Sequence, residues 1–165
     1  MNHLILMRHA EAEASGRGGD DPARGLTSRG RADAGRVADA LWRPPLRPHL
    51  ALVSSSVRTR ETWDVVSENF HDDIVEVQVR DDIYDADLAT LTRAVGMAAE
   101  HPGCVILIGH NPGIHMLAVH LLHDNAAGPY ALERLSRGFP AGAAAVFEAE
   151  AGGLRLADFI TPDQA

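Results

Sequence analysis

Short apolar runs alternate along this chain with stretches in which apolar residues recur every three or four positions. The short runs predict strands over 3–7, 50–54, 74–79, 104–109, 143–148 and 154–160. The helix-like stretches predict helices over 28–42, 57–69, 87–100 and 112–123. Strands that alternate with helices are typical of an α/β fold, and 165 residues suit a single domain over 1–165.

The composition of each run indicates its place in a sheet. Residues 104–109 are continuously apolar, which predicts a central strand covered on both faces. The run 74–79 has acidic neighbours and predicts an edge strand. The last two runs flank a short Gly-Gly segment, and they predict a hairpin. The polar stretch 124–142 has no clear assignment.

Two helix starts carry capping signals. Thr27 precedes the first predicted helix, and its hydroxyl can accept a hydrogen bond from a free backbone N–H there. Asn111 is expected to do the same for the fourth helix. Pro112 would then take the first helical position, where its missing N–H costs nothing.

Polar residues follow three of the predicted strands at the point where each strand ends. Arg8 and His9 follow the first strand, and His110 follows the fourth. Arg58 lies a few residues beyond the second strand, after three serines. Because open α/β sheets bind ligands at the carboxyl ends of their strands, we expect these four side chains to share one pocket.

Two histidines and two arginines in one pocket suit phosphoryl transfer, whose transition state spreads charge over three oxygens. A neutral imidazole can attack phosphorus, which makes His9 the candidate nucleophile. Arg8 and Arg58 would bind the oxygens through planar donors, although Arg60 is a rival for the second role. His110 would donate to the same oxygens from a helix start.

A metal site is the competing interpretation of the histidine-rich fourth helix. His110, His115 and His120 are five residues apart, which places them on different sides of a helix. They therefore cannot converge on one ion. His120 and His123 could share a face, but a helix C-terminus favours histidine without any metal. The spacing of these histidines therefore argues against a metal site.

Composition and charge exclude several function classes. A formal net charge of −8 argues against nucleic acid, although arginines aimed into one cleft can still bind phosphate. The chain shows neither a run of membrane-spanning length nor a secretory signal, so we expect a cytoplasmic protein. The single cysteine, Cys104, is expected to be buried packing. The pairs Asp20–Asp21 and Asp72–Asp73 are interpreted as solvated loop charges.

Several segments resemble one known family. Leu4 to Ala12 resembles the Arg-His signature of the histidine phosphatase (phosphoglycerate mutase-like) superfamily, and 24–30 and 57–62 resemble its next blocks. Residues 105–113 are similar to the second-histidine block of the small SixA-like phosphohistidine phosphatases. The resemblance implies a three-layer α/β/α sandwich with a mostly parallel central sheet. It also implies a phosphohistidine intermediate on His9 and no metal or organic cofactor.

The general acid is the feature that the sequence leaves open. Many members of the family place a carboxyl group near a segment like 81–87, and here Asp81, Asp82, Asp85 and Asp87 compete without a clear winner. An ester alkoxide needs a proton to leave, whereas the imidazole of phosphohistidine leaves more readily. The sequence therefore favours phosphohistidine on a partner protein as the substrate. The alternatives are small phosphorylated metabolites on the same site, or a module that binds phosphorylated partners without turnover.

Overall fold

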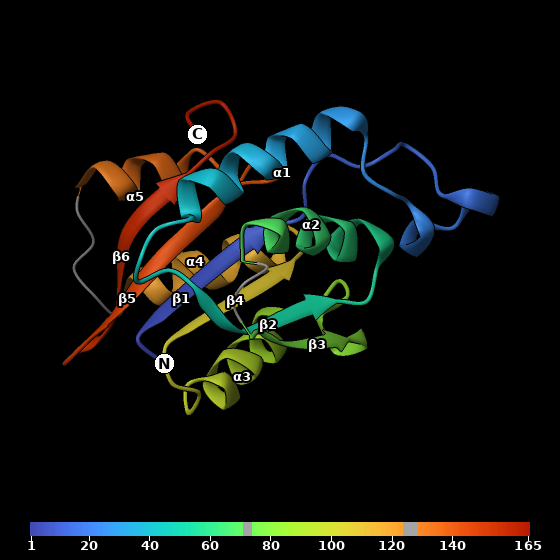
Figure 1. The fold of residues 1–165 in the computed structure, drawn as a ribbon. Coiled ribbons are helices and arrows are strands. Elements are labelled where there is room, and N and C mark those ends of the chain that lie inside the picture. Colours follow the sequence, from blue (N-terminus) through green and yellow to red (C-terminus); the bar gives the residue numbers. More distant parts are fainter. Residues whose placement is uncertain (71–73, 124–128) are drawn as a thin grey trace.

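The computed structural model describes residues 1–70, 74–123 and 129–165, which form a six-stranded sheet with helices on both faces (Figure 1). The strands are β1 (His3–Arg8), β2 (Pro48–Ser54), β3 (Glu76–Arg80), β4 (Cys104–Gly109), β5 (Ala144–Glu150) and β6 (Gly153–Ile160). The α-helices are α1 (Ser28–Leu41), α2 (Val57–Ser67), α3 (Leu88–Ala98), α4 (Gly113–His123) and α5 (Pro129–Ser136).

The strand order is β3-β2-β4-β1-β5-β6. Three of the five strand pairings are parallel, and β5 pairs antiparallel with both β1 and β6. The predictions of a mostly parallel sheet, of an edge position for β3 and of a closing hairpin are therefore confirmed. All of β4 is buried between its neighbours, as its continuous apolar sequence predicts.

Alternation along β1 shows how the strands bind the two helical layers together. Leu4 and Leu6 lie in the core that α3 and α4 cover, whereas Ile5 and Met7 lie in the core under α1 and α2. Successive side chains of a strand point to opposite faces, so one strand with apolar residues at every position serves both cores. Figure 1 shows the resulting helix, sheet and helix layers, which confirm the predicted three-layer sandwich.

The helix starts agree with the sequence at one cap and differ at the other. Thr27 caps α1, where its Oγ1 accepts the N–H of Gly30 at 2.9 Å. The prediction for Asn111 is wrong: α4 begins at Gly113, and the Asn111 side-chain amide donates to the Phe139 carbonyl at 2.9 Å. The Asn111 side chain is held by this carbonyl, which is distant in sequence, and does not cap the helix.

The stretch without an assignment contains a helix. Part of 124–142 forms α5, and its Leu135 is buried in the core together with Phe139. Residues 124–128 and the pair Asp72–Asp73 lie outside the described residues. Cys104 is fully buried, as predicted, and burial raises the pKa of its thiol to about 12. Within the described ranges, no helix has the length and apolar character needed to cross a membrane.

Candidate active site

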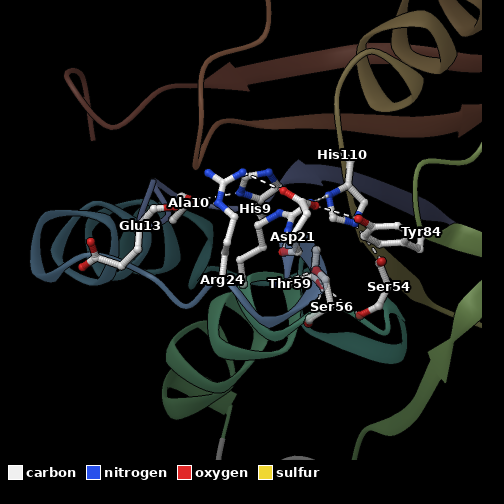
Figure 2. A network of polar contacts seen from close by, with 11 residues as sticks. His9, Ala10, Glu13, Asp21, Arg24, Ser54, Ser56, Thr59, Tyr84 and His110 are labelled. Carbon is white, nitrogen blue, oxygen red and sulfur yellow. Dashed lines mark hydrogen bonds and ion pairs between the residues drawn. The ribbon is translucent and has the colours of Figure 1, made fainter. Parts of the chain in front are cut away.

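Register across the sheet brings two of the predicted residues together. Arg8 pairs with Gly109 across β1 and β4, so His9 and His110 leave adjacent parallel strands at the same level. The His9 N–H donates to the Gly109 carbonyl at 3.0 Å, and the two imidazole rings lie 5.2 Å apart between centroids. Figure 2 shows both rings with Ser54, which ends the neighbouring strand β2.

The His9 imidazole is held with one nitrogen engaged and the other available. Its Nδ1 lies 2.8 Å from the Ala10 carbonyl oxygen, which can only accept, so Nδ1 carries the proton. Burial, with contributions from His110 and the two arginines, lowers the pKa of His9 to about 3 despite this hydrogen bond. The ring is therefore neutral near pH 7. No hydrogen bond to Nε2 occurs in the part of the chain that the structure describes, so its lone pair is available.

The backbone around His9 is fixed from a segment far away in sequence. Gly142 donates its N–H to the His9 carbonyl at 3.0 Å. Gly142 has a φ of +77°, and an added Cβ would contact Pro162 at 3.3 Å, so glycine suits this close approach. On the other side, the Ala10 N–H donates to Thr62 Oγ1 at 3.1 Å. These contacts set the direction in which the imidazole points.

Both predicted arginines are held beside the histidines. Arg8 donates from Nη1 to the Phe139 carbonyl at 3.0 Å, and Arg58 is only 4% exposed. The Nε atoms of both side chains are buried without a hydrogen-bond partner among the described residues. Buried N–H groups are normally paired, and an oxyanion would satisfy donors of this kind. Arg60, the rival candidate, is exposed on α2.

His110 is anchored through the opposite nitrogen from His9. Its Nε2 lies 2.8 Å from Ser54 Oγ, and its Nδ1 accepts from Arg58 Nη2 at 3.3 Å. The residue is 5% exposed, and the Tyr84 ring packs edge-on against it at 5.3 Å. Burial, followed by the charge of Arg58, lowers the pKa of His110 to about 4. This ring is also neutral near pH 7.

Asp21 is the pocket residue that the sequence interpretation missed. It is exposed, as the sequence predicted, but its carboxylate also accepts from Tyr84 Oη at 2.6 Å, Arg24 Nη1 at 2.9 Å and Arg58 Nη2 at 3.0 Å. The bonds from Tyr84 and Arg24 contribute most to holding the pKa of Asp21 well below its usual range. Nothing in the sequence distinguishes Asp21 from Asp20. The role of Asp21 arises from a tertiary contact that brings this loop to α2, and such a contact leaves no local sequence pattern.

The candidate acids of 81–87 are occupied elsewhere or lack a contact with the pocket. Asp82 pairs with Arg80, and Asp87 caps α3 by accepting the N–H of Thr90 at 2.9 Å. Among the described residues, neither these two nor Asp81 and Asp85 hydrogen-bond to the four predicted site residues. The segment instead places Tyr84 against His110.

His115, a further histidine of α4, is engaged away from this pocket. The ring of His115 donates from Nε2 to the Leu135 carbonyl at 3.0 Å, which links α4 to α5. Over the described ranges, no three His, Cys, Asp or Glu side chains are grouped closely enough to hold a metal ion.

The fold and this strand-edge pocket together define a class of protein. The model of the histidine phosphatase superfamily (branch 1) matches residues 4–94, which hold Arg8, His9 and Arg58. This range covers more than half of the chain, so the chain belongs to the histidine phosphatase superfamily, whose members are phosphatases. No curated protein sequence matches the chain.

Solved structures agree with this assignment over the whole chain. A SixA protein from Agrobacterium tumefaciens, assigned provisionally as a phosphohistidine phosphatase, is 30% identical, with a TM-score of 0.83 over 98% of each chain. A second such SixA protein, from Nakamurella multipartitia, is 26% identical, with a TM-score of 0.81 over 98% of this chain and 96% of that one. The protein histidine phosphatase SixA in complex with tungstate is 18% identical, with a TM-score of 0.76 over 98% and 97%, and shows the shared fold.

Proposed function

We propose that this chain is a phosphohistidine phosphatase that dephosphorylates a partner protein through a covalent phosphohistidine on His9. One observation carries the proposal: His9 is neutral, its Nδ1 proton is engaged by the Ala10 carbonyl, and its Nε2 is available beside the buried Arg58 and the half-buried Arg8. A nucleophile needs a free lone pair, and a phosphoryl group needs cationic donors around its oxygens. Arg8, Arg58 and His110 are the proposed donors.

The proposed reaction has two displacements at phosphorus. In the first, Nε2 of His9 forms a bond to phosphorus as the bond between phosphorus and the substrate imidazole breaks. In the second, water attacks the phosphorus, the bond to Nε2 breaks, and inorganic phosphate leaves while the second water proton passes to solvent. The Ala10 carbonyl keeps its hydrogen bond to Nδ1–H of His9 in both steps. When the bond between Nε2 and phosphorus breaks, the His9 side chain is therefore a neutral imidazole again.

Among the described residues, no carboxyl group is placed to give a proton to the leaving group, which supports a phosphoramidate substrate. Asp21 is the carboxylate that contacts Arg58, and its strongly lowered pKa keeps it ionised, so it cannot donate a proton near pH 7. A phosphohistidine that takes up a proton from water on its other ring nitrogen releases a neutral imidazole. Such a leaving group needs no acid from the enzyme, whereas an ester alkoxide does.

The relatives point in the same direction. The two SixA proteins at 30% and 26% identity are assigned provisionally as phosphohistidine phosphatases, and both matches cover 98% of this chain. A phosphatase of small phosphorylated metabolites would use the same pocket residues, so substrate profiling separates the two functions.

The experiment compares kcat/KM on a phosphohistidine peptide with kcat/KM on a simple alkyl phosphate. We expect clear preference for the phosphohistidine peptide, and we expect activity to survive exhaustive chelation. Equal or better turnover of the alkyl phosphate would overturn the substrate assignment. A double variant of His9 and His110 to alanine is the matched control for contaminating phosphatase activity.

A further inference from the structure

The residue behind His110 has no role in the reaction described so far. Ser54 is the last residue of β2 and is completely buried. Its hydroxyl lies 2.8 Å from Nε2 of His110, and no other hydrogen bond of this hydroxyl occurs among the described residues (Figure 2). The Ser54 carbonyl accepts from Thr59 Oγ1 at 2.7 Å, which fixes the backbone that carries the hydroxyl. Ser54 is therefore a rigid partner for one nitrogen of the ring.

The opposite nitrogen of His110 is on the side of the proposed phosphoryl site. Nδ1 lies 3.3 Å from Arg58 Nη2, and the His9 ring lies 5.2 Å away between centroids. An imidazole has two nitrogens on opposite sides of its ring, so an anchor at Nε2 determines where Nδ1 points. In this structure Nδ1 accepts from Arg58, which means that Nε2 carries the proton and Ser54 accepts it.

We propose that Ser54 is a positioning residue: by anchoring Nε2 of His110, it makes Nδ1 the nitrogen that donates to the phosphoryl group. This inference rests on the proposed function, in which His110 and Arg58 bind the same oxygens. When the anion is bound, Arg58 donates to it, and Nδ1 takes a proton from dihydrogen phosphate or from solvent hydronium; the ring is then an imidazolium, or it releases its Nε2 proton to solvent. Both groups then donate to the anion.

A hydroxyl suits this position because it serves either protonation state of the ring. If His110 becomes a neutral ring with its proton on Nδ1, the Ser54 hydroxyl donates to Nε2. If His110 becomes an imidazolium, the same hydroxyl accepts from Nε2–H. A carboxylate could only accept, and a lysine could only donate. Burial keeps water from replacing the hydroxyl, so its loss leaves Nε2 without a partner.

The same turn supplies a matched control. Ser56 is as buried as Ser54, at 1% exposure, but its hydroxyl contacts Thr59 Oγ1 at 2.7 Å and caps α2. Ser56→Ala removes a buried hydroxyl two residues away without touching His110. Ser54→Ala removes the anchor. A general weakening of the turn would affect both variants, whereas the proposed role affects only Ser54→Ala.

The most direct test is nitrogen-15 NMR of the histidine side chains during titration with inorganic phosphate. In the wild-type protein and in Ser56→Ala, we expect Nδ1 of His110 to become protonated as phosphate binds. In Ser54→Ala, we expect this response to weaken or to be shared between the two ring nitrogens. If Nε2 alone carries a proton when phosphate is bound to the wild-type protein, the inference is wrong, whether or not any variant folds. An unchanged Nδ1 response in Ser54→Ala would also overturn it.

Kinetics provide a second readout. We expect Ser54→Ala to lower kcat about tenfold, the equivalent of one buried hydrogen bond, with a smaller change in KM. Combined with His110→Ala, the Ser54 substitution should add no further loss, because it acts through the histidine. Additive losses would show that Ser54 acts by another route.

The two hypotheses fail in different ways. If phosphate changes neither nitrogen of His110 in the wild-type protein, His110 does not bind the anion, and the proposed function loses that donor. If phosphate protonates Nδ1 equally in the wild-type protein and in Ser54→Ala, the donor remains and only the role of Ser54 is refuted.

Discussion

The ends of β1 and β4 present the same residue type in opposite ways. His9 is anchored through Nδ1 by the carbonyl of the next residue, which leaves Nε2 available. His110 is anchored through Nε2 by Ser54 on another strand, which leaves Nδ1 facing Arg58. The two strands are parallel neighbours in register, so the sheet places the rings at the same level. The choice of anchor, rather than the fold, decides which nitrogen each ring offers.

This difference explains how two neutral imidazoles can take separate roles. A backbone carbonyl can only accept a hydrogen bond, so it fixes the His9 proton on Nδ1. The lone pair of Nε2 is then available throughout. A serine hydroxyl can accept or donate, so His110 is free to carry a proton on the nitrogen that faces the anion. In the proposed reaction, the first ring attacks phosphorus and the second donates to the phosphoryl oxygens.

The largest expected effect comes from removing the His9 imidazole at the end of β1. We expect His9→Ala to lower kcat by about 10⁴-fold or more, because both ring nitrogens of the other imidazole, His110, are already engaged by Ser54 and Arg58. Phosphate binding should persist, since the arginines remain. Steady-state kinetics measure the loss of turnover, and titration with phosphate by calorimetry measures the binding that remains. Substantial residual turnover in a protein free of contaminants would contradict the assignment of the nucleophile.

The next largest effect concerns Arg58, the arginine that donates to His110. We expect Arg58→Ala to lower kcat/KM about 10²- to 10³-fold, because a buried charged donor to the transition state is lost. Arg60→Ala is the matched control, since Arg60 is exposed on the same helix and should leave activity unchanged. A larger loss in the Arg60 variant than in the Arg58 variant would reverse the assignment.

Acidification tests the neutral state of His9. Its folded pKa of about 3 lies below the value of about 6.5 expected in the unfolded chain. Between these values the unfolded chain binds the additional proton, so stability falls as the pH falls through this window. Because His9 is half-buried, we expect it to contribute a loss of about 1 kcal/mol between pH 7 and 5. Urea unfolding should show a smaller loss in His9→Ala, and an equal loss would contradict the shift.

The smallest effect concerns the carboxylate beside Arg58. Asp21→Asn removes a negative charge near the proposed phosphoryl site and frees part of the Arg58 guanidinium. We expect phosphate to bind about threefold more tightly, a modest gain because the Asp21 side chain is half-exposed. Inhibition by inorganic phosphate measures this change. Weaker binding would indicate that Asp21 holds Arg58 in its binding position rather than competing with the anion.

Much of the fold follows from sequence because its signals are local or periodic. The apolar run of β4 and the cap at Thr27 each depend on residues close in sequence. Arg8, His9 and His110 could be placed together because parallel strands bring their carboxyl ends to one edge. These predictions needed only the strand assignments.

The missed features depend on tertiary contacts that leave no local pattern. Asn111 has the residue type of a helix cap, but the Phe139 carbonyl competes for its amide. Asp21 joins the pocket only because its loop packs against α2, where Arg58 meets it. Ser54 is one of three consecutive serines, and only the three-dimensional structure shows that its hydroxyl contacts His110.

The most direct test is to trap and map the phosphorylated enzyme. The protein is mixed with a phosphohistidine peptide, quenched in base, digested and analysed by mass spectrometry. We expect base-stable, acid-labile phosphate on His9 and none on His110. Phosphate on His110, on an aspartate or on a serine would contradict it, as would rapid turnover with no phosphorylated chain at any quench time.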